Sequence, residues 1–106
     1  MAKYMYQVSY SQDGIRGVMK EGAVSRADFI GKTVANMGGQ MESFHFAFGD
    51  TDVYVIVDLP SDETAAALAL AVGSTGTGSI QTGKLLTPEQ VDAARGIDTG
   101  YRAPGA

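Results

Sequence analysis

Two alternating segments, residues 40–48 and 53–59, constrain the fold of this chain most strongly. Phenylalanine occupies every second position at the end of the first segment, and valine does so through most of the second. A period of two is typical of β-strands, whose successive side chains point to opposite faces of a sheet. Pro60 ends the second segment, because proline has no N–H group to give to a sheet ladder. The pattern predicts two adjacent antiparallel strands joined by a short loop.

Two more strands are predicted outside this pair. Residues 3–10 alternate tyrosine and valine with methionine, glutamine and serine, which again is the period of a strand. A stretch rich in glycine and threonine leads into a fourth predicted strand over residues 77–86. The four strands leave room for one helix after the first strand and one after the third.

The expected helix boundaries rest on capping residues. Residues 25–28, Ser-Arg-Ala-Asp, resemble a capping box and predict a helix that ends at Gly38-Gly39. Ser61 is expected to cap a second helix that stops at Gly73. Residues 87–90, Thr-Pro-Glu-Gln, predict the start of a short third helix, because threonine suits the N-cap and proline the first helical position.

The order of elements is therefore β-α-β-β-α-β, followed by a short C-terminal helix and tail. This order predicts an α+β fold of the ferredoxin-like type, a four-stranded antiparallel sheet with its helices on one face. A chain of 106 residues is long enough for one such domain and too short for two. We expect the domain to span residues 1–95 and an irregular tail to span residues 96–106.

Composition excludes several classes of function. The net charge is −4 and no stretch gathers Lys or Arg, so we expect no nucleic-acid partner. The chain has no cysteine, which excludes a thiolate nucleophile and a cysteine-ligated metal. Residues 65–72, the longest apolar run, fall far short of the ~20 residues that span a bilayer, so we expect no membrane partner. The first residues lack the apolar core of a secretion signal, and we expect a cytoplasmic protein.

Pairing of the alternating segments sorts their side chains into two faces. With Phe48 opposite Val53, the phenylalanines and valines share one apolar face, which we expect beneath the helices. The other face then carries Ser43, His45, Ala47, Tyr54, Ile56 and Asp58. From the first strand we place Met5, Gln7 and Ser9 on this second face. The alternative puts the row of Tyr4, Tyr6 and Tyr10 there instead.

His45 is the one histidine of the chain and the one candidate catalytic residue on this second face. An imidazole there can act as a general acid or base near neutral pH. The competing interpretation is a histidine hydrogen-bonded to Gln7, Ser9 or Tyr54 at a subunit interface. We favour the interface, because a catalytic base usually has a carboxylate or second base beside it. Gln7, Ser9, His45 and Tyr54 are the candidate ligand-binding residues.

The second predicted helix indicates assembly. Residues 65–72 are apolar nearly all round, and such a helix is buried on more than one side. Either the C-terminal helix or another subunit must cover the side that the sheet does not. The second sheet face also mixes apolar and small polar residues, as subunit interfaces do. We therefore predict a homo-oligomer, a dimer at least, with Met5, Ala47 and Ile56 as interface candidates.

Two polar segments predict neither a metal nor a cofactor. Asp50 and Asp52 provide fewer oxygen ligands than a divalent cation takes, and aspartate is common in turns. The glycine-rich residues 73–78 follow the end of a helix, whereas a phosphate cradle leads into the start of one. We expect no metal site and no cofactor.

The whole set of segments resembles a known family. The stretch GGQMESFHFAFGDTDVYVIVDLP, the helix AAALALAV, the ending LLTPEQVD and the early GIRGVMKEG are similar to the GYD-domain proteins over residues 3–95. The resemblance implies a small bacterial protein of the dimeric α/β-barrel group of ferredoxin-like folds. The chain departs from the family pattern at Thr51, where the tyrosine of the Gly-Tyr-Asp signature is expected, and at His45, where an aromatic residue fits.

Two functions are compatible with these features. The first is a structural or regulatory homo-oligomer, an interaction module whose second sheet face is an interface. The alternative is a protein that binds a small molecule, or a cofactor-independent enzyme, through a cleft at the sheet face. Fold-level similarity does not decide between them, because one fold carries many functions.

Overall fold

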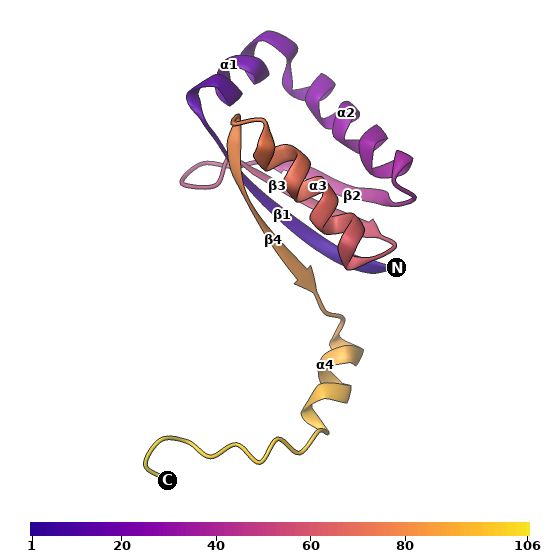
Figure 1. The fold of residues 1–106 in the computed structure, drawn as a ribbon, viewed down its shortest axis with the longest axis vertical. Helices are drawn as coiled ribbons and strands as arrows, with labels where there is room; N and C mark the ends of the chain where they lie inside the picture. Colours follow the sequence, from indigo (N-terminus) through magenta and orange to yellow (C-terminus); the bar gives the residue numbers. More distant parts are fainter.

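A four-stranded antiparallel sheet lies at the centre of the computed structural model, which describes residues 1–106 (Figure 1). Its strand order is β2-β3-β1-β4, and the strands are β1 (Ala2–Tyr10), β2 (Gln40–Phe46), β3 (Val53–Leu59) and β4 (Gly78–Leu85). The helices are α1 (Gln12–Glu21), α2 (Ala23–Asn36), α3 (Asp62–Ser74) and α4 (Pro88–Arg95). The predicted α+β, ferredoxin-like arrangement is confirmed.

The register of the central strands decides which side chains form the core. Tyr4 of β1 pairs with Val57 of β3, and Tyr6 pairs with Val55. Directly paired residues share a face, so the tyrosine row lies with the valines. The alternative placement of the tyrosines is thereby wrong, and Met5, Gln7 and Ser9 lie on the opposite face as predicted.

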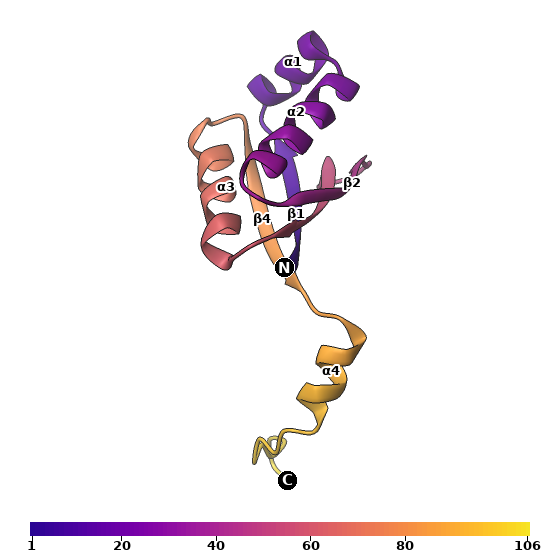
Figure 2. The ribbon, with the colours of Figure 1, turned by 90° about the vertical axis from the view of Figure 1, so that its right-hand side faces the viewer.

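One hydrophobic cluster holds α2 and α3 against the same face of the sheet. Val34 of α2 and Leu68 of α3 are both buried in it. Figure 2 shows α3 beside the strands and α2 in front of them. The cluster has nine buried residues, namely Tyr4, Tyr6, Val34, Val53, Val55, Val57, Leu59, Ala65 and Leu68. The opposite face of the sheet, here called the open face, carries no helix.

The phenylalanines do not form the core that the sequence predicts. The pairing is Phe46 with Val53 rather than Phe48 with Val53, a shift of two residues that keeps the face but moves Phe48 out of the strand. Phe48 is fully exposed, Phe46 is 45% exposed, and Phe44 packs at the margin of the core. The reason is that α2 covers the other end of β2. There the Met41 methyl group lies 3.3 Å from where a Cβ of Gly31 would be.

The helices after β1 begin differently from the prediction. Ser11 caps α1 by accepting a hydrogen bond from the Gly14 N–H at 3.2 Å. Gly22, with φ of 95°, then separates α1 from α2, so α2 starts at Ala23. The predicted start at residues 25–28 is wrong, because the backbone break at Gly22 precedes it.

The other helix ends follow the capping residues more closely. The predicted stop at Gly38-Gly39 is confirmed, and the Gly39 N–H donates to the Val34 carbonyl at 3.0 Å. Ser61 caps α3 as predicted, but α3 continues through Gly73 to Ser74. Residues 87–90 form the predicted capping box at the start of α4.

Beyond β4 the chain leaves the body of the domain. Residues 86–106, here called the C-terminal arm, extend away with α4 in their middle (Figures 1 and 2). Every residue of the arm is exposed. The radius of gyration is 16.9 Å, against ~13 Å for a compact chain of this length. The arm therefore does not cover α3, and Leu70 on the outer side of α3 is 74% exposed.

None of the helices combines the length and the apolar character that crossing a bilayer requires.

Two tyrosines of β1 tie the sheet to α3. The Tyr6 hydroxyl donates to the Ala65 carbonyl at 2.7 Å, and the Tyr4 hydroxyl donates to the Asp62 carboxylate at 2.5 Å. Burial raises the pKa of Tyr6 to about 12. The hydrogen bond to Asp62, together with burial, raises the pKa of Tyr4 to about 12. Both phenols are therefore held neutral against α3.

Alkaline pH is expected to weaken the fold through these tyrosines. Each folded-state pKa lies above the ordinary value of about 10, so the stability that it contributes is complete below pH ~10 and is lost as the pH rises towards ~12. Urea melts at pH ~8 and pH ~11 measure this loss. Between these two pH values, the unfolding free energy of Tyr6→Phe should fall by less than that of the wild type. Tyr101→Phe, at a position 77% exposed in the arm, should follow the wild type. An equally steep loss in Tyr6→Phe would contradict this assignment.

Two glycines of α1 should respond in opposite directions to alanine. A Cβ at Gly14 would lie 1.9 Å from the backbone oxygen of Thr77, whereas a Cβ at Gly17 would meet nothing within 4 Å. Gly14→Ala should therefore lower the unfolding free energy by about 1–3 kcal/mol through overpacking. Gly17→Ala should raise it by up to about 1 kcal/mol, because alanine is the better helix former. Urea melts of the two variants measure both changes, and a Gly14→Ala protein as stable as the wild type would rule out the close contact with Thr77.

Candidate functional site on the open face

The candidate residues gather in rows across the open face. His45 of β2 pairs with Tyr54 of β3, Tyr54 with Gln7 of β1, and Gln7 with Gln81 of β4. The structure thus brings three of the four predicted ligand-binding residues into one row. Gln81 was not among the predicted residues, because residues 77–86 do not alternate between apolar and polar side chains and so give no sign of their faces.

A second row lies beside the first and is less polar. Ser43 pairs with Ile56, Ile56 with Met5, and Met5 with Gly83. The two interface candidates Met5 and Ile56 are therefore neighbours in space. Ala47, the third candidate, follows the end of β2 and donates its N–H to the Asp52 carbonyl at 2.9 Å, so it lies at the edge of this face.

His45 is exposed on the edge strand β2. Ser9, one of its predicted partners, instead donates its hydroxyl to the Asp50 carbonyl at 2.6 Å. Asp58 lies four positions along β3 from the residue that faces His45, or ~13 Å at the usual rise of a strand. The open face therefore places no carboxylate beside His45 to orient or activate its imidazole.

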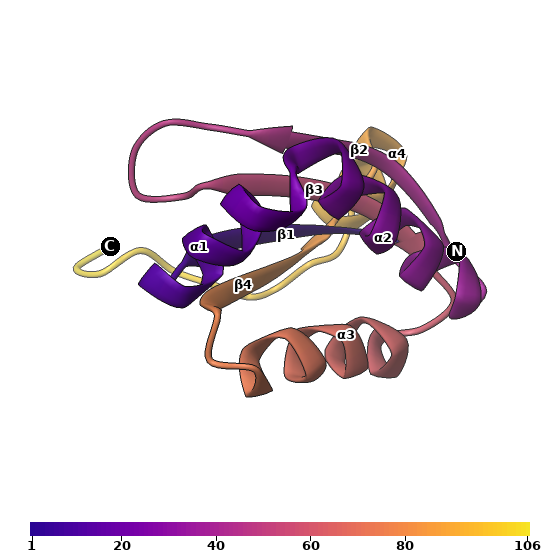
Figure 3. The same cartoon turned by 90° about the horizontal axis from the view of Figure 1, so that it is seen from above.

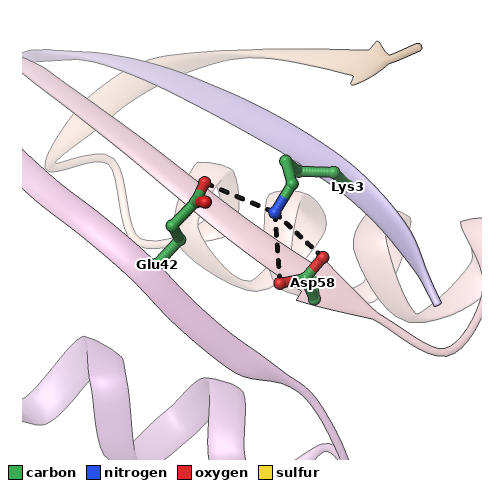
Figure 4. A network of polar contacts seen from close by, with 3 residues as sticks. All are labelled: Lys3, Glu42 and Asp58. Carbon is green, nitrogen blue, oxygen red and sulfur yellow. Dashed lines mark hydrogen bonds and ion pairs between the residues drawn. The ribbon is translucent and has the colours of Figure 1, made fainter. Parts of the chain in front are cut away.

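Three charged side chains form an ion network at the far end of the open face (Figure 4). The Lys3 ammonium lies 3.1 Å from Asp58 Oδ1 and 3.3 Å from Glu42 Oε2. The hydrogen bond to Asp58 is the main reason that the pKa of Lys3 is raised. These side chains are partly exposed, so solvent screens the ion pairs and their contribution to stability is small.

An irregularity in β2 brings Glu42 into this network. Met41 pairs with Val57 and Ser43 pairs with Ile56, so Glu42 is an extra residue in the strand. A bulge of this kind re-aims a side chain, and it allows Glu42 to reach Lys3 on the open face. Glu42 was not predicted, because the alternation of residues 40–48 carries no sign of the extra residue. Lys3 shares the alternation of residues 3–10 with Met5 and Gln7, and that alternation could have placed it on the open face.

The loop between β2 and β3 is fastened to β1 through Asp52. Its carboxylate accepts the Tyr10 N–H at 2.8 Å, and its own N–H donates to the Val8 carbonyl at 2.9 Å. Asp52 therefore connects the loop to the distant strand β1, in addition to its place in the local turn. The glycine-rich residues 73–78 begin with the last two residues of α3 and continue past its C-cap Thr75, so they do not open a helix.

The two aspartates of this loop should differ in their importance for stability. Asp52→Ala removes the acceptor of the Tyr10 N–H and should lower the unfolding free energy by about 1–3 kcal/mol. Asp50→Ala should change it by less than about 0.5 kcal/mol, because its contact with Ser9 is made by the backbone carbonyl. Thermal and urea melts compare the two variants directly. Equal losses in both would show that the Asp52 carboxylate does not fasten the loop.

Comparison with known proteins adds one finding to this geometry. No curated protein and no solved structure matches the chain. The model of the GYD domain matches residues 4–94, a range that contains nearly all of β1, the other three strands and α1 to α3, together with most of α4. The chain therefore belongs to the GYD domain family.

Proposed function

We propose that this chain is a homo-oligomeric interaction module that buries its open face against a second copy of itself. The observation that carries the proposal is the bare face of the sheet. All four strands present side chains there, and no element of the chain covers them. Met5 and Ile56 at its centre make it too apolar to favour full solvation, and a patch of this kind marks an interaction site.

The rows of the open face suit a contact between identical surfaces. In a two-fold interface each side chain of one copy meets the same patch of the other, so the patch must contain both hydrogen-bond donors and acceptors. Gln7, Gln81, His45 and Tyr54 provide both within one row. Gly83 in the next row has no side chain, and its Cβ position lies 4.0 Å from its single neighbouring atom, which leaves space for a side chain of the partner.

The environment of His45 favours an interface over catalysis. General acid–base chemistry needs a group that orients the imidazole, and the carboxylate of Asp58 is both distant and occupied by Lys3. At an interface, by contrast, an imidazole beside Tyr54 serves as one more hydrogen-bonding group. We therefore propose a structural or regulatory role for the assembly, with a second copy of the chain as the partner.

The C-terminal arm gives independent support. Its α4 lies largely within the family match, yet every arm residue is exposed in the single chain. Val91 and Ile97 are among its exposed apolar side chains, at 50% and 68%. A domain whose last helix packs on nothing in its own chain has a surface available for a second copy.

Ile56→Asp tests the proposed contact. The substitution places an unpaired charge at the centre of the open face, which should dissociate the assembly because a buried charge without a partner is costly. Light scattering on the eluting protein gives the mass of each species, and circular dichroism should show an intact fold.

Val24→Asp is the matched control. Val24 is 77% exposed on α2, on the helix-covered side of the sheet, so its variant should assemble as the wild type does. A wild-type protein that is monomeric at micromolar concentration would refute the proposal, and so would an Ile56→Asp protein that keeps the wild-type mass.

A further inference from the structure

The helices leave a gap over the middle of the sheet. The helix α2 runs along β2 and α3 runs along β4, so they lie apart above the central strands β1 and β3 (Figure 3). Side chains fill this gap only in part. An outer cleft of about 420 Å³ opens between α1, α2 and α3, and an inner cavity of about 50 Å³ lies deeper, against the sheet. Both hollows are lined by Tyr10, Arg26, Ile30, Leu68, Val72 and Thr77.

The deeper part of this hollow is apolar. Phe44, Val53 and Val55 line it from the sheet, and Ile30, Leu68 and Val72 close it from the helices. Apolar surroundings of this kind accept apolar groups. The outer cleft has the volume of ordinary small-molecule sites, which run from roughly 300 to 1,000 Å³. The two together offer a site for a ring-sized apolar body.

Polar groups converge where the two hollows meet. Tyr10 and Arg26 both line the junction, and the Arg26 guanidinium also lies 5.4 Å from the centre of the Phe29 ring. Burial raises the pKa of Tyr10, and the neighbouring Arg26 offsets part of that rise. The Tyr10 phenol is therefore neutral near pH 7 and able to donate or accept a hydrogen bond.

The charges of the lining are balanced in pairs. Arg26 Nη1 lies 3.7 Å from Glu21 Oε1, and both side chains are about one-third exposed. Asp13 at the mouth is paired with Arg16 at 3.4 Å. The cleft thus carries no uncompensated charge, which favours an uncharged occupant over an anion or a cation.

We propose that this hollow binds a small uncharged molecule that has an apolar body and a single hydroxyl or carbonyl group. The apolar body lies against Leu68 and Val72 and reaches towards the inner cavity. The polar group faces Tyr10 and Arg26. This site lies beneath the helices, on the side of the sheet opposite to the open face, so it does not depend on the proposed assembly.

A pair of neutral aromatic probes tests the site in the full chain. The probe 1-naphthol has the proposed hydroxyl group and naphthalene lacks it. The chain has no tryptophan, so the fluorescence of the probes is read without an indole background. We expect 1-naphthol to bind saturably with one site per chain. An absence of saturable binding of 1-naphthol to the wild-type chain overturns the proposal.

Two glycines on different helices provide a matched pair of variants. Gly17 lines the outer cleft and Gly73 does not, and at both positions an added Cβ would meet nothing within 4 Å. Gly17→Leu should fill part of the cleft and weaken 1-naphthol binding at least tenfold. Gly73→Leu should leave the dissociation constant unchanged. Circular dichroism checks the fold of both, and equal affinities in the two variants overturn the location of the site.

Tyr10→Phe tests the polar end of the site, because it removes the hydroxyl and keeps the ring. It should weaken 1-naphthol binding several-fold and leave naphthalene binding unchanged. An equal effect on both probes overturns the assigned role of the hydroxyl. Ile56→Asp, on the other face, should bind both probes as the wild type does, so a failed assembly and a failed binding site give different results.

Discussion

The pairing of β1 with β3 is the constraint on which the rest of the structure depends. Tyr4 and Tyr6 lie opposite Val57 and Val55 beneath the helices. Because the side-chain period of a strand is two, this placement forces Met5 and Gln7 onto the open face. The tyrosine hydroxyls then fix α3 through Ala65 and Asp62. One register thus determines the core, the position of a helix and the composition of the exposed surface.

Features that depend on neighbouring residues in the sequence were predicted correctly, whereas features that depend on contacts between distant segments were not. Ser61 and Thr87 cap their helices as expected, because a cap needs only its own following turn. The roles of Glu42 and Asp52 were not predicted, since a bulge and a hydrogen bond to β1 depend on the neighbouring strands. The predicted core of phenylalanines was wrong for a similar reason. Alternation gives the face of a side chain, but whether a helix reaches over that face is set by tertiary packing.

The gap above the central strands follows from how each helix is anchored. Gly39 follows the C-terminal end of α2, and a Cβ at this position would lie 2.3 Å from the Asp58 carbonyl. The glycine therefore allows the chain after α2 to lie directly against the end of β3. The tyrosines hold the first turns of α3 on the same face of the sheet, nearer to β4. These contacts hold the C-terminal end of α2 and the first turns of α3, whereas the cleft is lined by the earlier turns of α2 and the second half of α3. The cleft therefore opens where neither helix is held by these contacts.

In the single chain, the helix α4 of the C-terminal arm has little to stabilise it. An isolated helix of eight residues is marginal in water, because few backbone hydrogen bonds offset the cost of nucleation. The capping box at Thr87 contributes locally, but α4 buries none of its residues. Most helices in proteins are stabilised by packing of an apolar side, and for α4 the chain itself provides no such surface. The proposed assembly would supply it, because a second copy brings further exposed surface, including the outer side of its α3, within reach of an extended arm.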